Sequence, residues 1–227
     1  MNRRPKIDLP PKKRILLVDD HPMMREGLTQ LIQHETDLEI CGEAGEANEA
    51  IEKINTLKPD LVLSDITLPG KNGIELIKDI HAMHPALLVL VLSMHDESLY
   101  VERVLRAGGR GYVMKQEGGK KIMEAIRQVL GGHIHVSEKM SSKILEIFSG
   151  RRADVASSPV EKLTDREFEV FQLIGQGLGT KQMADKLHLS AKTIDVHRAN
   201  IKAKLQLGSV SELIRHAVRW AESQNPG

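Results

Sequence analysis

The first half of the chain alternates short, nearly continuous apolar runs with stretches that have helical periodicity. Strands built almost entirely of Leu, Val and Ile are typical of a parallel sheet that is covered by helices on both faces. The alternation therefore predicts a doubly wound α/β domain with five strand-helix repeats, a (βα)5 order. The expected strands are Ile15–Val18, Leu38–Cys41, Leu61–Leu63, Leu87–Leu92 and Gly111–Met114.

Helix boundaries are indicated between these strands. Pro22 suits the first turn of a helix, where its missing N–H has no partner to lose, and Asn48 lies near the start of the next helix. Pro59 and Pro85 follow the second and third expected helices.

A second, helical domain is expected after a linker. From Leu163 onward there is no β-rich run, and apolar residues recur at helical spacing. Gly131-Gly132 and the polar stretch 149–162 interrupt the pattern, and a linker helix is predicted for Glu138–Phe148. We therefore divide the chain into a basic tail (1–13), an α/β domain (14–132), a linker (133–160) and a small all-α domain (161–227).

Length and cysteine content narrow the class of protein. A chain of 227 residues has room for two small domains. Its only cysteine is Cys41, which excludes an intramolecular disulfide and a cysteine-based zinc site and favours a reducing cytoplasm. The longest apolar run, Ala86–Leu92, is far shorter than the roughly 20 residues of a membrane span.

A net charge of +1 conceals two oppositely charged parts. Residues 15–132 hold 12 Lys and Arg against 19 Asp and Glu, a net of −7, whereas residues 181–219 hold 8 against 3, a net of +5. A basic segment of this size is a candidate surface for nucleic acid, and a solvated charged face is the alternative.

Polar side chains follow the expected strands at the sheet edge where ligands bind in parallel α/β folds. Asp19 and Asp20 follow the first strand, Asp65 the third, Ser93 the fourth and Lys115 the fifth. A single aspartate there is more often a turn residue, but a full set favours a site. Converging carboxylates suit Mg²⁺, and one of them can act as a nucleophile that forms an acyl phosphate.

The second domain has the pattern of a helix-turn-helix. Thr164 and Glu167 form a capping box that opens the first helix, a second helix is expected over 181–187, and a third over 191–205 after the turn 188–190. Lysine and arginine on the third helix suit entry into the DNA major groove. A helical bundle with a charged, solvated face is the alternative reading of this pattern.

The segments KKRILLVDDHPMMREGL, DLVLSDITLPGKNGIEL, LVLSMHDE and AGGRGYVMKQE together resemble a response-regulator receiver domain, which is flavodoxin-like. Leu68 and Gly109 depart from the residues usual there and do not touch the chemistry. The resemblance implies Asp65 as phospho-acceptor; Asp19, Asp20, Asp65 and the backbone carbonyl of Thr67 as Mg²⁺ ligands; Ser93 as switch hydroxyl; Lys115 as phosphoryl partner; and Tyr112 as the aromatic residue that reorients on activation.

Residues 163–220 resemble the LuxR-type helix-turn-helix of NarL/FixJ-family regulators, through LTDRE, GLGTKQMADKLHLS and TIDVHRANIKAKL. Asp195 stands where lysine is frequent, so it either accepts a hydrogen bond from cytosine N4 or pairs with Arg198 or Lys192 away from DNA. The resemblance implies base contacts from Asp195, Val196 and Ala199, with Lys181, Lys192, Thr193, His197, Arg198 and Lys202 nearby for phosphates.

Together the resemblances imply a two-component response regulator that acts as a transcription factor. A partner histidine kinase would phosphorylate Asp65 with Mg²⁺, and phosphorylation would shift dimerisation and binding to twofold-related DNA half-sites. In this family the inactive receiver often covers the recognition helix. Two alternatives are a Mg²⁺-dependent phosphohydrolase, for which the sequence offers no obvious general acid, and a DNA-binding protein that ignores phosphorylation.

Overall fold

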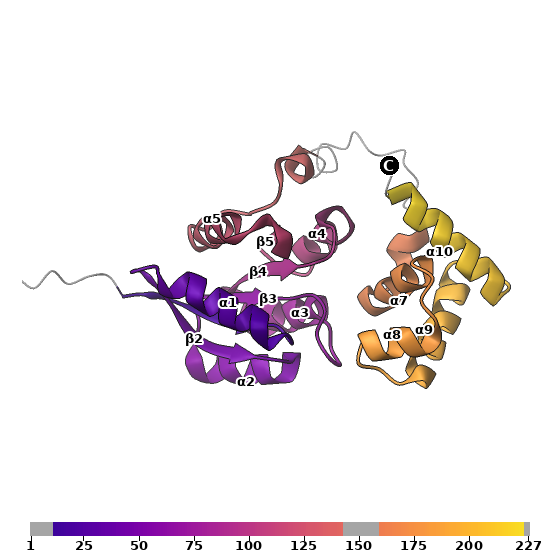
Figure 1. The fold of residues 1–227 in the computed structure, drawn as a ribbon, viewed down its shortest axis with the longest axis horizontal. Helices are drawn as coiled ribbons and strands as arrows, with labels where there is room; N and C mark the ends of the chain where they lie inside the picture. The colour runs from indigo at the N-terminus through magenta and orange to yellow at the C-terminus, as the bar shows by residue number, and fades with distance from the viewer. Residues whose placement is uncertain (1–10, 143–158, 225–227) are drawn as a thin grey trace, which may run out of the picture.

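The computed structural model describes residues 11–142 and 159–224. Its first domain contains a sheet of five parallel strands in the order β2-β1-β3-β4-β5, which confirms the doubly wound, flavodoxin-like expectation (Figure 1). The strands are β1 (Lys13–Val18), β2 (Leu38–Ala44), β3 (Leu61–Ser64), β4 (Leu88–Ser93) and β5 (Gly111–Met114).

Strand β2 runs three residues beyond the predicted end at Cys41. Its register against β1 shifts between Ile15 and Leu16, and the added residues Gly42, Glu43 and Ala44 pair with the second half of β1. The strand lies at the edge of the sheet and is mostly half-buried, so it tolerates a glutamate that ends the apolar run. Hydrophobicity alone therefore placed its end too early.

Helices cover both faces of the sheet (Figure 1). Leu28 and Ile32 of α1 pack with Ile122 and Ile126 of α5 in one apolar cluster, and α2, α3 and α4 contribute to a second cluster. The helices are α1 (Pro22–Gln33), α2 (Ala47–Leu57), α3 (Gly73–Met83), α4 (Glu97–Arg106) and α5 (Gly119–Leu130), with a 3-10 turn η1 (Lys115–Glu117) before α5.

The predicted helix starts are confirmed where the sequence offered a signal. Pro22 occupies the first turn of α1. Thr164 accepts a hydrogen bond from the Glu167 N–H, and the Glu167 side chain accepts one from the Thr164 N–H, which completes the expected capping box. Asn72 and Glu75 form an equivalent box at the start of α3.

The second domain is helical, as expected. After a 3-10 turn η2 (Pro159–Lys162) it contains α7 (Asp165–Gly175), α8 (Thr180–Lys186), α9 (Ala191–Lys204) and α10 (Val210–Gln224). Residues 138–142 are helical, so the predicted linker helix begins at Glu138, and the rest of it lies outside the described residues.

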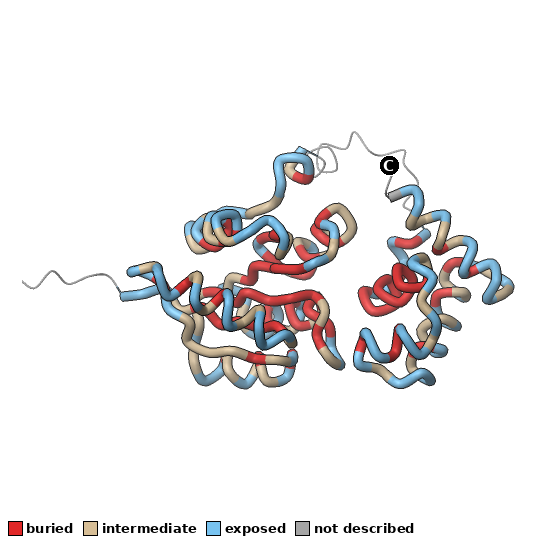
Figure 2. The backbone as a smooth tube through the Cα atoms, viewed as in Figure 1, coloured by how far each residue is buried: buried red, intermediate tan, exposed pale blue. Residues whose placement is uncertain are grey.

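Helix α7 is the element through which the second domain meets the first. It lies opposite α3 and α4 in Figure 1, and almost its whole length is buried (Figure 2). The apolar cluster under α2, α3 and α4 continues through Tyr100 and Phe168 into the core of the second domain. The two domains therefore share one apolar core in this arrangement.

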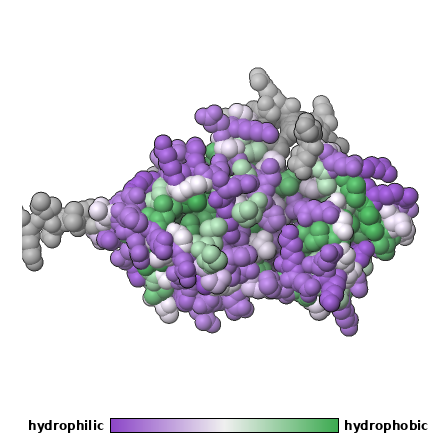
Figure 3. All heavy atoms as spheres, in the orientation of Figure 1, coloured by the Kyte–Doolittle hydropathy of each residue, from purple (hydrophilic) through white to green (hydrophobic). Residues whose placement is uncertain are grey.

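The surface is mostly hydrophilic on the face drawn in Figure 3, with small apolar patches on both domains. Large exposed apolar side chains include Met23 on α1 and Val196 on α9. Within residues 11–142 and 159–224, no helix is long and apolar enough to cross a membrane.

Candidate functional site

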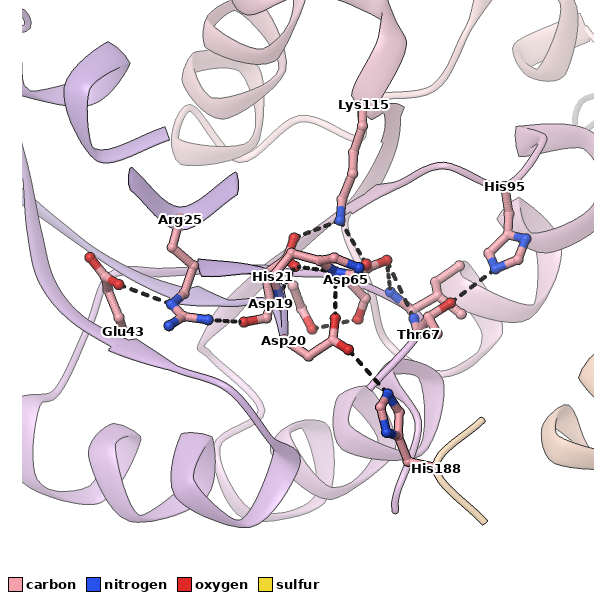
Figure 4. A network of polar contacts seen from close by, with 12 residues as sticks. Asp19, Asp20, His21, Arg25, Glu43, Asp65, Thr67, His95, Lys115 and His188 are labelled. Carbon is pink, nitrogen blue, oxygen red and sulfur yellow. Dashed lines mark hydrogen bonds and ion pairs between the residues drawn. The ribbon is translucent and has the colours of Figure 1, made fainter. Parts of the chain in front are cut away.

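Three strand ends bring Asp19, Asp65 and Lys115 together in one pocket (Figure 4). Nζ of Lys115 donates to Oδ2 of Asp19 at 2.6 Å and to Oδ2 of Asp65 at 2.7 Å, and all three side chains are about 95% buried. Burial lowers the pKa of Lys115, but the two carboxylates outweigh it and the net pKa is raised. The ammonium therefore stays charged and screens the two carboxylates from each other.

The Asp65 carboxylate is held in one orientation by its own loop. Its Oδ1 accepts hydrogen bonds from the N–H of Ile66 at 2.6 Å and of Thr67 at 3.3 Å, which leaves Oδ2 facing Lys115. Gly73 lies so close that a Cβ there would stand 2.0 Å from the Asp65 carbonyl oxygen. Burial raises the pKa of Asp65 against the opposing effect of Lys115, so a bound cation would help to keep this group ionised.

The pocket has the donor set of a hard cation. Ligand atoms of Asp19, Asp20, His21 and Asp65 lie within 4.8 Å of one another. Oδ1 of Asp20 is buried and accepts no hydrogen bond, although Nδ1 of His21 approaches it to 2.6 Å. Several carboxylate oxygens with an unused acceptor fit Mg²⁺, which takes oxygen ligands from one or two carboxylates and from water.

The switch residues expected from the sequence lie beside this pocket. Ser93 is fully buried at the end of β4, and its Oγ accepts a hydrogen bond from the N–H of His95 at 3.4 Å. Tyr112 is also buried, and its hydroxyl donates to the His95 carbonyl at 2.8 Å. Burial raises the pKa of Tyr112, so the phenol is neutral and acts as a donor.

An arginine on α4 anchors the second domain. Nη1 of Arg103 donates to the Leu163 carbonyl at 2.9 Å and to Oδ1 of Asp165 at 3.0 Å, and Nη2 donates to the Val160 carbonyl at 3.2 Å. The guanidinium also lies over the Phe168 ring, 4.3 Å from its centroid. Arg103 thus holds the segment before α7, and the first residue of that helix, against the first domain.

Further contacts between the domains surround this arginine. Lys78 of α3 pairs with Asp165 at 2.6 Å, and the Arg166 guanidinium donates to the Gly70 carbonyl at 3.0 Å. At the turn before α9, Nε2 of His188 lies 3.5 Å from Oδ2 of Asp20 (Figure 4). The helix-turn-helix turn therefore reaches the rim of the acidic pocket.

Two family models match the chain: the response regulator receiver domain over residues 15–127, and the bacterial regulatory proteins of the luxR family over residues 161–217. The oxygen regulatory protein NreC of Staphylococcus aureus (strain MRSA252) is 34% identical over 210 residues, which is 91% of this chain and 97% of NreC. The chain belongs to the NarL/FixJ family of response regulators. It is a two-component response regulator with a receiver domain and a LuxR-type DNA-binding domain.

Solved structures of related response regulators have the same fold. A LuxR-family regulator from Aurantimonas sp. SI85-9A1 is 35% identical with a TM-score of 0.57, covering 61% of this chain and 99% of that one. In a structure of two RcsB dimers bound to two parallel DNAs, the RcsB chain is 26% identical with a TM-score of 0.55, covering 90% of this chain and 97% of that one.

The helix expected to enter the DNA major groove is α9, and the side of it that carries the implied base contacts is not covered. Asp195, Val196 and Ala199 are all exposed, with Val196 at 52%. The receiver in this structure therefore does not cover the residues implied to contact bases, unlike the arrangement often found in the family. It covers α7 instead, because the anchoring contacts of Arg103 lie at the start of that helix.

The other implied DNA-contacting residues have mixed surroundings. Within the described residues, Asp195 forms no ion pair with Arg198 or Lys192, so that expected alternative is not found. Arg198 instead donates to the Thr180 hydroxyl at 2.8 Å, which ties α9 to α8. Lys181 and Lys192 are exposed, whereas Thr193, His197, Arg198 and Lys202 are partly buried.

Several residues of the site escaped the sequence analysis. His21 adjoins the acidic pair, and Arg25 donates to the Asp19 carbonyl at 2.6 Å (Figure 4). His95 shares a hydrogen bond with the Thr67 hydroxyl at 3.0 Å. The only sequence signal for these residues was that they lie near Asp20 or Ser93 in the chain. His188, which comes from the other domain, had no such signal.

Proposed function

We propose that this response regulator is a transcription factor whose DNA binding is controlled by a phosphoryl group on Asp65, donated by a partner histidine kinase. The observation that carries the proposal is the Lys115 ammonium shared between Asp19 and Asp65, in a pocket whose rim touches the helix-turn-helix. A buried aspartate that is held in one orientation, with its Oδ2 facing a cation, is suited to accept a phosphoryl group. We place the protein in the cytoplasm, with its DNA and its kinase.

The carboxylates of Asp19, Asp20 and Asp65, with the Thr67 carbonyl, would hold Mg²⁺. When bound, the ion would supply positive charge that offsets the negative charge of the carboxylates and of the incoming phosphoryl oxygens. His21 lies 3.2 Å from Oδ1 of Asp19 and within reach of Asp20, so it helps to orient the ligands as a neighbour of the pair.

Phosphoryl transfer uses groups that are already in place. An Asp65 carboxylate oxygen forms a bond to phosphorus while the bond from phosphorus to the donor breaks, and the donor leaves with that electron pair and takes up a proton from water. Lys115, already charged, turns from the two carboxylates toward the new phosphoryl oxygens, and the Ser93 hydroxyl donates to another. Water slowly hydrolyses the acyl phosphate and restores the free Asp65 carboxylate. The chain therefore accepts one phosphoryl group and does not turn over as an enzyme.

Phosphorylation would then shift the position of the second domain. Recruitment of Ser93, at the end of β4, draws the start of α4 toward the pocket, and α4 carries the Arg103 anchor of α7. Undocking lets the exposed face of α9 take the orientation that DNA demands in a homodimer, with two recognition helices about one helical turn apart. The related RcsB dimers on DNA support this arrangement.

The direct test is intact mass after incubation with a small phosphodonor, with and without Mg²⁺. We expect the native chain to gain one phosphoryl group only with Mg²⁺, and the matched variant Asp65→Asn to gain none. The phosphorylated chain should then bind promoter DNA more tightly than the Asp65→Asn chain. Absence of any gain with several donors would refute the proposal.

Two further measurements, phosphate release and DNA affinity, separate the two alternative functions. Continuous release of phosphate from phosphomonoesters, beyond one equivalent per chain, would support a phosphohydrolase instead. Equal DNA affinity of the native chain before and after phosphorylation would support a DNA-binding protein that does not respond to the receiver.

A further inference from the structure

A continuous series of contacts joins the Asp65 loop to α7. Its first link lies within the loop, where the Thr67 N–H donates to Oδ1 of Asp65 at 3.3 Å. The Thr67 side chain points the other way, and its hydroxyl shares a hydrogen bond with Nε2 of His95 at 3.0 Å (Figure 4). Thr67 therefore contacts the phospho-acceptor with its backbone and His95 with its side chain.

The backbone of His95 also forms hydrogen bonds with the two switch side chains, Ser93 and Tyr112. Its N–H donates to Ser93 Oγ at 3.4 Å, and its carbonyl accepts from the Tyr112 hydroxyl at 2.8 Å. A displacement of Ser93 or Tyr112 therefore changes the hydrogen bonds that hold the His95 backbone. His95 therefore contacts three residues beside the pocket, Thr67, Ser93 and Tyr112.

The His95 ring then contacts the interface with the second domain. It packs on Tyr100 of α4 with 4.9 Å between ring centroids, and Tyr100 packs on Phe168 of α7 at 5.5 Å. The fully buried Tyr100 hydroxyl donates to Oε1 of Gln172, also on α7, at 2.5 Å. Every step from Asp65 to α7 is a direct contact.

A cavity beside His95 gives the ring room to move. Its volume is about 240 Å³, and its walls include His95 and Leu99 of the receiver with Gln172 and Trp220 of the second domain. Burial lowers the pKa of His95 to about 4, so the ring is neutral and fits the space without a counter-ion. A tilt of the ring would change the packing of Tyr100 directly.

We propose that His95 is a positioning residue that makes the docking of α7 depend on the state of Asp65. The inference rests on the proposed function and adds a route through a side chain that is neither Ser93 nor Tyr112. New phosphoryl oxygens on Asp65 compete for the Thr67 N–H and shift the Thr67 backbone, the contact of its hydroxyl with His95 breaks, and Tyr100 loses the ring that holds it against Phe168. Docking then weakens.

The test compares docking in two states of the full chain, without ligand and with Mg²⁺ plus beryllium fluoride as a stable phosphoryl mimic. Trp220 is the only tryptophan and lines the cavities between the domains, so its emission follows docking. For each variant, the ratio of the docking constants in the two states measures coupling. A residue with a merely structural role would lower both constants equally and leave the ratio unchanged.

We expect the native ratio to be at least about tenfold, as the loss of one buried hydrogen bond and its packing implies. His95→Leu should reduce the ratio severalfold, because only the route through Ser93 and α4 remains. His95→Gln, whose amide can still share a hydrogen bond with the Thr67 hydroxyl, should retain most of it. If His95→Leu does not fold by circular dichroism, Thr67→Val against Thr67→Ser poses the same question from the other partner.

A native ratio above tenfold that persists in His95→Leu, or in Thr67→Val when that pair is used, would overturn the inference and leave the proposed function intact. A native ratio of one, with beryllium fluoride bound according to ¹⁹F NMR, would overturn both. Loss of the ratio in His95→Gln as well as in His95→Leu would also refute the hydrogen-bond route.

Discussion

Arg103 is the residue whose removal should release α7 most strongly. It donates to two backbone carbonyls and to Asp165 across the domain boundary and lies over Phe168, with its side chain 18% exposed. Arg103→Ala removes all four contacts at once. In this variant Asp165 still forms its ion pair with Lys78 at 2.6 Å, so its buried carboxylate does not lose every charged partner.

The loss can be estimated from these contacts. A hydrogen bond to a charged group contributes roughly 1.5–3 kcal/mol, and a partly desolvated cation–π contact about 1–2 kcal/mol. Such contributions are not additive when one side chain makes them all, so we expect a loss of about 3 kcal/mol in the free energy of docking. That corresponds to a factor of about 100 to 200 in the docking constant.

Urea titration of the unphosphorylated chain measures this effect. Trp220 emission reports docking, and far-UV circular dichroism reports unfolding. In Arg103→Ala, the emission change should precede the loss of helical signal. Arg106→Ala is the matched control, because Arg106 lies on the same helix, is 72% exposed and pairs with Glu102 of its own helix. If the two variants dock with free energies within about 0.5 kcal/mol of each other, the assigned role of Arg103 is wrong.

Three further predictions concern a loop, a buried acid and DNA. Gly73→Ala should destabilise the receiver by about 2 kcal/mol or more in urea unfolding, because its Cβ would meet the Asp65 carbonyl, whereas Gly27→Ala, with nothing within 4 Å, should stabilise it slightly. Burial raises the pKa of Glu169 from 4.5 to about 7 despite Arg166, so its stabilising effect is complete below about pH 4.5 and is lost as the pH rises through 7. The Glu169 carboxyl of α7 interacts with the Asn72 side chain of the receiver, so docking should weaken from pH 6 to pH 8. Glu169→Gln should flatten that profile of Trp220 emission, and an equally steep or steeper profile would contradict this. Lys192→Ala should reduce the slope of log affinity against log salt on promoter DNA by about one, without changing sequence preference.

The sequence was sufficient for much of the fold because its signals are local. Continuous apolar runs, Pro22 at the start of α1, and the Thr164 and Glu167 capping box each determine structure within a few residues. The pocket was also predictable, since parallel strands deliver their carboxyl ends to one edge, and the side chains of Asp19, Asp65 and Lys115 do meet there.

The arrangement of the domains could not be read in this way. Arg103 and Asp165 are 62 positions apart, and neither the charge of α4 nor the apolar stripe of α7 says which surfaces meet. For the same reason, the sequence does not say which residues of α9 the receiver leaves exposed. An edge strand such as β2 is another case, because its residues are satisfied by pairing rather than by burial.

The contacts from Asp65 through His95 to Gln172 have a consequence for DNA itself. Thermodynamic linkage is reciprocal, so if a phosphoryl group on Asp65 favours separation of α7 from the receiver, anything that holds α7 away must favour the phosphorylated form by the same factor. A promoter that binds the freed domain is then not only a target of the regulator but also a ligand that favours its phosphorylated form. Its occupancy shifts the balance of phosphoryl groups between this regulator and its donor toward Asp65.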